Sequence, residues 1–288
     1  MAKRKRCPSE EKMLRWIKEG RGQGRGSEYK PWLRIQDVPS QGLSSRVLGR
    51  KTGRTHHLLS KLETAFFYLW EWHPHIIDIR EQYPLLPLSA TQAIADRLRI
   101  RHPAFRGIPV VMTTDVVVTI ERNDRLIEVA ITIKYAKDLG NKRTLEKLEI
   151  ERVFWRDLSI PWLIVVDRDL PTALARNLEH LHPFHDPLAF FPLTATDIAT
   201  IGGSLTDAVR SSRAPLCKIA GECDAKFHLR PGTSLAISYH LIATRHWCID
   251  LLRPFQPELP IQILKHGPEW DAMVDQVASI NRQFSEEA

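Results

Sequence analysis

The sequence contains little cysteine and no long apolar stretch. Its four cysteines, Cys7, Cys217, Cys223 and Cys248, are scattered over 288 residues, which excludes a disulfide-stabilised scaffold and favours a reducing compartment. No window approaches the run of about 18 uncharged apolar residues that a membrane span requires. The basic start of the chain lacks the apolar segment of a secretory signal. We therefore expect a cytoplasmic protein with no membrane partner.

Three of the cysteines, Cys217, Cys223 and Cys248, raise the question of a zinc site together with His228 and His246. Their spacing matches none of the standard zinc patterns. Reduced cysteines packed in the core are therefore the favoured interpretation.

Positive charge is concentrated at the start of the chain. The whole sequence carries 41 Lys and Arg against 34 Asp and Glu, in an otherwise ordinary globular composition. Residues 1–60 hold 15 basic and 5 acidic residues, whereas residues 61–168 are nearly neutral and residues 169–288 have a net charge of −4. A basic block of this kind suggests a polyanionic partner, most often nucleic acid, although a solubilising tail has the same composition.

The basic segment has a glycine- and arginine-rich stretch after a predicted helix at residues 10–20. Glycine lets the backbone approach a surface closely, and arginine binds phosphate. We expect DNA phosphate contacts here, with a flexible surface loop as the alternative. The candidate contact residues are Arg21, Arg25, Arg46, Arg50, Lys51 and Arg54. His56 and His57 follow them, either near phosphate or at the surface where the next helix starts.

Residues 55–72 are predicted to form an amphipathic helix, and Glu63 lies at the edge of its apolar face. Ser60 and Glu63 have the spacing of a capping box, in which both side chains satisfy backbone N–H groups at the helix start. The alternative is an inward carboxylate that serves a functional site. The segment alone slightly favours the cap.

A β-hairpin is predicted from residues 110–120 and 125–136, which are rich in β-branched side chains. A turn at Asn123 and Asp124 would place Asp115 opposite Thr132 and on the same face as Lys134. The hairpin therefore brings an aspartate and a lysine together beside a hydroxyl group. Two carboxylates, Glu63 and Asp115, together with this lysine suit Mg²⁺-dependent phosphodiester hydrolysis.

The remaining pattern divides the chain into two domains. A helix at 143–158 and a buried strand at 161–167 complete an α/β sheet with packed helices. Glu149 and Glu151 on that helix face either the hairpin or solvent, and solvent is the default. After residue 170 we expect helices at 172–180, 194–210 and 232–252 and a short strand at 260–264, in a mainly helical, winged-helix-like domain.

Several segments together resemble the TnsA family, the endonuclease subunits of heteromeric bacterial cut-and-paste transposons. The resemblance is collinear over roughly residues 8–170 and looser in the C-terminal half, where RHWCIDLLRPF carries it. The matching N-terminal segments are SSRVLGRKTGRTHHLLSKLE (44–63), DIREQYPL (78–85), TTDVVV (113–118), TIK (132–134), RTLEKLEIERVFW (143–155) and IPWLIVVD (160–167).

The resemblance implies an N-terminal domain like a type II restriction endonuclease, related to the PD-(D/E)xK nucleases. It implies that Glu63 and Asp115 bind Mg²⁺, with Mn²⁺ as a substitute, in a site of one or two ions, and that Lys134 assists catalysis. Thr132 stands where the family has a glutamine, so its hydroxyl or the Ile133 carbonyl would complete the metal site. Glu149 and Glu151 are candidates for the outer shell.

The resemblance also implies partners: transposon-end DNA, an Asp-Asp-Glu (DDE) transposase and an AAA+ ATPase regulator. We expect a basic segment at 1–60 within the nuclease domain, an endonuclease core at 61–170 and a partner-binding domain at 171–288. The predicted activity is cleavage of the 5′ strands at transposon ends. Two alternatives are an assembly adaptor with a decayed site, suggested by Thr132, and a stand-alone restriction-type nuclease.

Overall fold

The computed structural model describes residues 9–38, 43–186 and 192–264, and within them the chain divides after Leu170 into two units. The first unit contains the sheet and the residues expected to carry chemistry. The second unit is helical. The basic residues at 3–6 and Cys7 lie outside the described residues.

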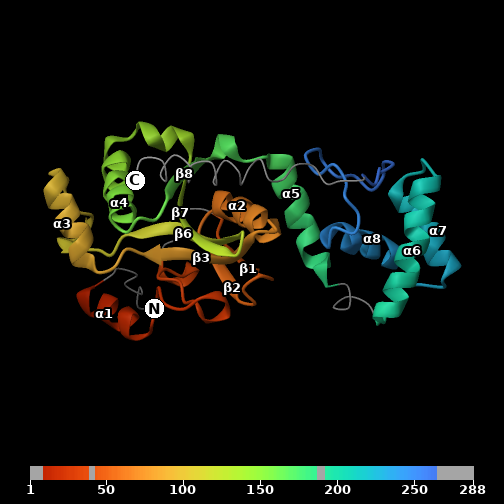
Figure 1. Ribbon diagram of the computed structural model, residues 1–288, viewed down its shortest axis with the longest axis horizontal. Helices are drawn as coiled ribbons and strands as arrows, with labels where there is room; N and C mark the ends of the chain where they lie inside the picture. The colour runs from red at the N-terminus through yellow and green to blue at the C-terminus, as the bar shows by residue number, and fades with distance from the viewer. Residues whose placement is uncertain (1–8, 39–42, 187–191, 265–288) are drawn as a thin grey trace, which may run out of the picture. The chain divides into compact units, whose positions relative to one another are not determined.

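A four-stranded mixed sheet organises the first unit (Figure 1). Its order is β3-β6-β7-β8, with β3, β6 and β7 antiparallel and β8 parallel to β7. Consecutive residues of β6 and β7 are buried, because both faces of these central strands are covered. The strands are β3 (Ile76–Pro84), β6 (Thr113–Arg122), β7 (Arg125–Lys134) and β8 (Trp162–Val166).

The hairpin predicted from the sequence is confirmed with its two-residue turn. Strands β6 and β7 pair from Arg122 with Arg125 to Val116 with Ile131. Asn123 and Asp124 both adopt positive φ, at 50° and 59°, as a tight hairpin turn requires. The register fixes which side chains meet at the far end of the hairpin.

Helices α3 (Leu88–Leu98) and α4 (Lys142–Asp157) pack on this sheet. Ile150 and Trp155 from α4 form a core cluster with Ile94 from α3 and Val117 from β6. Helix α4 also makes the crossover between the parallel strands β7 and β8, as expected for the predicted helix–strand pair. In Figure 1, α4 and the N-terminal helix α1 lie on opposite sides of the strands.

Part of one predicted helix is a strand. Residues 55–72 divide into β2 (Thr55–Leu58) and helix α2 (Lys61–Trp72), and β2 pairs with β1 (Ser45–Leu48). The prediction was wrong for residues 55–58, because the apolar face of α2 starts only at Leu62 and β2 is buried with a period of two. Strand β3 and helix α3 were not assigned from the sequence.

The glycine- and arginine-rich stretch is part of the fold. Helix α1 (Glu10–Lys18) buries Trp16 against Trp32, both about 2% exposed. Gly22 has φ +79°, and a Cβ there would lie 2.1 Å from Pro84 Cγ at the end of β3. This loop therefore packs against the sheet rather than forming a flexible surface loop. The small hairpin of β4 (Ala104–Phe105) and β5 (Ile108–Pro109) also belongs to this unit.

The second unit contains four described α-helices, and two of them match the helices predicted at 172–180 and 194–210. The helix predicted at 232–252 ends at Ala243, shortly before Arg245 turns the backbone to φ 64°. Within the described part of this unit, the only β pairing is one bridge between Cys248 and Leu264. The helices are α5 (Thr172–Leu181), α6 (Ala195–Ser211), α7 (Leu216–Lys226) and α8 (Thr233–Ala243).

None of the helices in residues 9–38, 43–186 and 192–264 has the length and apolar character needed to cross a bilayer.

Candidate active site

Asp115 and Lys134 meet where the β6–β7 hairpin ends. Lys134 Nζ donates to Asp115 Oδ2 across 2.8 Å and to the Ile133 carbonyl across 2.9 Å. The Ile133 N–H donates to the same Asp115 oxygen across 2.7 Å. The hairpin geometry inferred from the turn therefore brings these groups together. Both side chains are partly exposed, so this end of the hairpin is open to a ligand.

Glu63 is held at the first turn of α2 by the helix start itself. Ser60 is the N-cap and its Oγ accepts from the Glu63 N–H, while the same hydroxyl donates to Glu63 Oε1 across 2.9 Å. Glu63 Oε2 accepts from the Leu59 N–H. In a standard capping box it would accept from the N–H of the N-cap residue, here Ser60, which is one residue later. Helix capping by Glu63 therefore does not exclude a role of its carboxylate in a functional site.

The negative charge of Asp115 acts on the ionisation of Glu63. Burial, followed by the negative charge of Asp115, raises the pKa of Glu63 to about 7. Burial lowers the pKa of Lys134, but the negative charges of Asp115, Glu151 and Glu63 raise it by more. The net shift of the Lys134 pKa is therefore upward. Two carboxylates that repel each other beside a single lysine form a site that a divalent cation would stabilise.

Thr132 is buried and its hydroxyl is occupied within the protein. It donates to Glu151 Oε1, and Trp162 Nε1 donates to it across 3.2 Å. Thr114 also donates to Glu151 Oε1, across 2.7 Å. Burial and the charge of Asp115 raise the pKa of Glu151 to about 7. Thr132 therefore connects the hairpin to a buried glutamate on α4.

Of the two outer-shell candidates, only Glu151 lies near the site. Glu149 is partly exposed and forms a salt bridge with Arg152 across 2.7 Å on the solvent side of α4. The default of a solvent-facing side chain therefore fits Glu149, which lies on the charged face of α4, but was wrong for the buried Glu151. Glu151 lies three residues after Leu148 and four before Trp155, on the buried face, and this helical period could have separated the two residues.

Two of the arginines expected to contact DNA are buried. Arg54 donates from Nη1 and Nη2 to both oxygens of Glu81, across 2.8 and 2.6 Å. Arg21 donates to Asp37 and to the Trp32 carbonyl. We correct the DNA-contact expectation for Arg21 and Arg54, because their guanidinium groups are occupied inside the fold.

The two histidines of this region differ from expectation as well. His56 is fully buried, with Nδ1 2.8 Å from Glu81 Oε2 and Nε2 2.7 Å from Thr52 Oγ1. It lies neither at a phosphate nor at the surface, because it is in the middle of a buried polar network. His57 is half-buried, and its backbone N–H donates to Glu81 Oε1.

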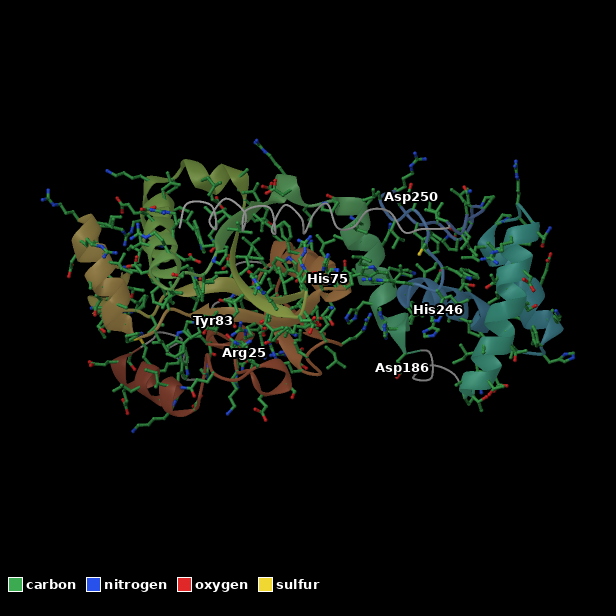
Figure 2. The ribbon with its side chains drawn as sticks, in the orientation of Figure 1. Arg25, His75, Tyr83, Asp186, His246 and Asp250 are labelled. Carbon is green, nitrogen blue, oxygen red and sulfur yellow. The ribbon has the colours of Figure 1, made fainter. Side chains whose placement is uncertain are left out.

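The other basic candidates lie nearer the surface. Arg25, labelled in Figure 2, is exposed, and its Nη2 lies 2.5 Å from Glu128 Oε1. Arg46 and Arg50 are exposed on the β1–β2 hairpin. Lys51 donates from Nζ to the carbonyls of His73 and Ile76 and thereby anchors the hairpin turn.

The chemistry of the donors at the site fits a hard cation. Glu63 and Asp115 offer carboxylates and Ile133 a carbonyl, which are the oxygen ligands that Mg²⁺ and Mn²⁺ prefer. Across the described ranges, no group of three or more His, Cys, Asp or Glu side chains is arranged to hold a metal ion. Mg²⁺ is commonly held by one or two carboxylates together with water and substrate phosphate, so two carboxylates suffice.

The cysteines beyond Cys7 are free thiols in different environments. Cys223 is buried in the core of the second unit, as expected, whereas Cys217 is exposed and Cys248 is half-buried. The core assignment was therefore wrong for Cys217, which lies on the exposed face of α7.

One polar residue of the site was missed in the sequence. Gln82 in strand β3 is buried, and its Nε2 donates to Glu63 Oε2 across 3.3 Å. The available signal was a neutral amide in a segment otherwise flanked by charged and aromatic residues, Glu81 and Tyr83.

Comparison with known proteins agrees with the two-unit division of the chain. A family model described as "TnsA-like endonuclease N terminal" matches residues 73–167, and one described as "TnsA endonuclease C terminal" matches residues 169–251. The first range includes Asp115 and Lys134 and starts after Glu63. The Tn7 transposition protein TnsA of Escherichia coli is 48% identical over 182 residues, which is 63% of this chain and 66% of that protein.

Proposed function

Because the chain belongs to the TnsA-like endonuclease family, we propose that it is a metal-dependent DNA endonuclease that cuts the 5′, non-transferred strands at transposon ends. The observation that carries this proposal is the convergence of Asp115 and Lys134 at the hairpin end, with Glu63 close enough for Asp115 to raise its pKa. The nuclease domain is proposed to be restriction-endonuclease-like and the second unit winged-helix-like.

Glu63 and Asp115 would hold the cation, and the Ile133 carbonyl would be available as a further oxygen ligand. The chemistry that Mg²⁺ or Mn²⁺ would supply there, as one or two ions, is activation of a water and stabilisation of charge on the scissile phosphate. Lys134, already between Asp115 and the Ile133 carbonyl, donates to the phosphate oxygens as negative charge develops there. Thr132 holds Glu151 in place, and its hydroxyl is not assigned to the metal.

DNA contact falls to the exposed basic residues. Arg46 and Arg50 lie on the β1–β2 hairpin, and Arg25 lies beside the sheet. Arginines at the surface can bind backbone phosphate and make binding sensitive to salt. Arg21 and Arg54 stabilise the fold through buried ion pairs instead.

The proposed partners are transposon-end DNA, a DDE transposase that handles the other strand, and an AAA+ ATPase regulator. The second unit, from Pro171 onward, is the proposed partner-binding region. A protein that handles only one strand needs a second nuclease activity for double-strand excision, which is why a transposase partner belongs to the proposal. We propose a cytoplasmic location, where this DNA is found.

The test is cleavage of labelled end DNA by the protein together with the transposase, in Mg²⁺ or Mn²⁺. We expect 5′ cuts with the wild-type protein and none with Asp115→Ala, while complex assembly is unchanged. Undiminished cutting by Asp115→Ala would overturn the site assignment.

The second candidate is an adaptor that bridges transposase and ATPase without cutting. It is favoured by Thr132, whose hydroxyl is occupied by Glu151 and Trp162 rather than offered to a metal. An adaptor gives no 5′ cuts with either metal ion, even when the wild-type protein assembles on end DNA. A stand-alone restriction-type nuclease would instead cut a fixed sequence without any partner.

A further inference from the structure

Gln82 has an unusual backbone conformation for a residue inside a strand. Its φ is 50°, in the left-handed region, although it lies within β3 and is not glycine. It is only 3% exposed. Backbone of this kind costs about 1–3 kcal/mol and persists where the surrounding structure requires it. The conformation therefore calls for an explanation at this position.

The position of Gln82 joins the two carboxylates of the site. Strand β3 pairs with β6 through Glu81 with Val116 and Tyr83 with Thr114, so the same register places Gln82 opposite Asp115. The Gln82 amide donates to Glu63 Oε2 across 3.3 Å. One residue thus lies across the strand pair from Asp115 and contacts Glu63 directly.

The N-terminal segment fixes this conformation from the other side. The Trp32 N–H donates to the Gln82 carbonyl across 3.2 Å, and the Tyr29 hydroxyl donates to the Glu81 carbonyl across 3.1 Å. Both aromatic residues are buried, and the Tyr29 ring stacks on Tyr83, labelled in Figure 2. The carbonyl that the left-handed turn takes out of regular strand geometry therefore has its own partner.

We propose that Gln82 is a positioning residue of the nuclease site, which orients the Glu63 carboxylate for the divalent cation and is held in place by Trp32. This inference rests on the proposed function. A neutral amide suits the role, because it satisfies one lone pair of Glu63 and brings no positive charge to compete with the metal ion. Glu63 is then fixed from both sides, by the α2 cap and by Gln82.

Two variants test the proposal. Gln82→Asn keeps an amide and tolerates the left-handed conformation, but shortens the side chain by one methylene. Gln82→Gly relaxes the backbone and removes the amide altogether. Gln92→Asn makes the same shortening on helix α3, outside the site, and is the matched control.

The first measurement is Mn²⁺ binding to the purified full-length protein by titration calorimetry, with thermal unfolding recorded in parallel. We expect both Gln82 variants to bind Mn²⁺ about 10- to 100-fold more weakly, as is typical when a residue that orients a metal ligand is lost. Gln82→Gly should keep a melting temperature near that of the wild type, because relief of the left-handed backbone offsets the loss of the side chain. The control should match the wild-type protein in both measurements.

The second measurement is the Mg²⁺ dependence of 5′ cleavage on end DNA with the transposase present. We expect the Mg²⁺ concentration for half-maximal cutting to rise in both Gln82 variants and excess Mg²⁺ to restore cutting. Wild-type Mn²⁺ affinity and Mg²⁺ dependence in both variants would overturn the role of Gln82 and leave the nuclease proposal intact. If Gln82→Gly loses Mn²⁺ binding only because it no longer folds, Gln82 has a structural role. That result would also overturn its role as a positioning residue. A wild-type protein that binds no Mn²⁺ and makes no cuts would overturn both proposals.

Discussion

Lys134 Nζ lies 2.8 Å from Asp115 Oδ2, and both residues belong to one hairpin. Lys134 lies ten residues after the turn and Asp115 eight residues before it. The tight turn fixes the register, and the register places the ammonium on the carboxylate. The contact between Asp115 and Lys134 is therefore set by the register of this hairpin. The proposed site also includes Glu63 from α2, Gln82 from β3 and the buried Glu151 of α4.

Replacing the lysine tests its assigned role. Lys134→Met removes the ammonium but keeps most of the side-chain volume, so we expect 5′ cleavage to fall about 10²- to 10³-fold, the usual effect of losing one donor to developing charge. Binding to end DNA should persist. The matched control is Lys137→Met, three residues on and exposed. Equal cleavage by the two variants in a single-turnover assay would exclude a catalytic role for Lys134.

The helix cap and the metal ligand can be separated at the start of α2. Ser60→Ala removes the N-cap hydroxyl and should cost about 1 kcal/mol of unfolding free energy, with 5′ cleavage reduced rather than lost. Glu63→Gln keeps an acceptor for the Leu59 N–H but removes the negative charge, so it should lose Mn²⁺ binding. Chemical unfolding and calorimetry measure the two effects. A Glu63→Gln protein that still binds Mn²⁺ like the wild type would remove Glu63 from the metal site.

Arginines of opposite burial should behave differently. Arg54→Ala leaves the buried Glu81 without its bidentate partner and should destabilise the protein by about 3–5 kcal/mol. Arg46→Ala is exposed on the β1–β2 hairpin and should change stability by less than about 0.5 kcal/mol, while it weakens end-DNA binding and lowers its salt dependence. Denaturant unfolding and DNA binding at several salt concentrations test both. Salt-dependent DNA binding that responds to Arg54 but not to Arg46 would contradict the assignment.

The buried Glu81 should make the free energy of unfolding depend on pH. Burial opposes its charge, but His56 and Arg54 overcome this and lower the pKa of Glu81 well below its usual value of 4.5. The stabilisation is therefore fully present above pH 4.5 and is lost as the pH falls below it. The difference in unfolding free energy between the wild type and Glu81→Gln should shrink below pH 4.5. Glu222→Gln, exposed on α7, is the control. A difference that stays constant between pH 6 and 3 would contradict this explanation.

Local sequence determines the parts of the site that depend on short-range geometry. The turn at Asn123 and Asp124 gives the Asp115–Lys134 pair, and the Ser60–Glu63 spacing gives the start of α2. Buried contacts between distant segments could not be predicted in this way. No residue near Arg54 in the sequence indicates that its partner is Glu81, 27 residues away.

The same limit applies to other corrected positions. Residues 55–58 were predicted as helix because the apolar spacing of Leu62 and Phe66 extends back to Leu59, yet pairing with β1 makes residues 55–58 a strand. Gln82 could not be placed because its left-handed backbone depends on contacts with Trp32 and on the facing strand β6. Charge composition indicated a basic segment but did not indicate that Arg21 packs inside it.

Strand-resolved cleavage of transposon-end DNA tests the central claim most directly. The wild-type protein, Asp115→Ala and Glu63→Gln are each combined with the transposase and labelled end DNA in Mg²⁺ or Mn²⁺, and the products are separated on a denaturing gel. Of the three proteins, we predict that only the wild type cuts the 5′ strand. Assembly on the DNA should be unchanged in all three. Undiminished 5′ cutting by Asp115→Ala, or no 5′ cutting by the wild-type protein with either metal ion, would contradict the account.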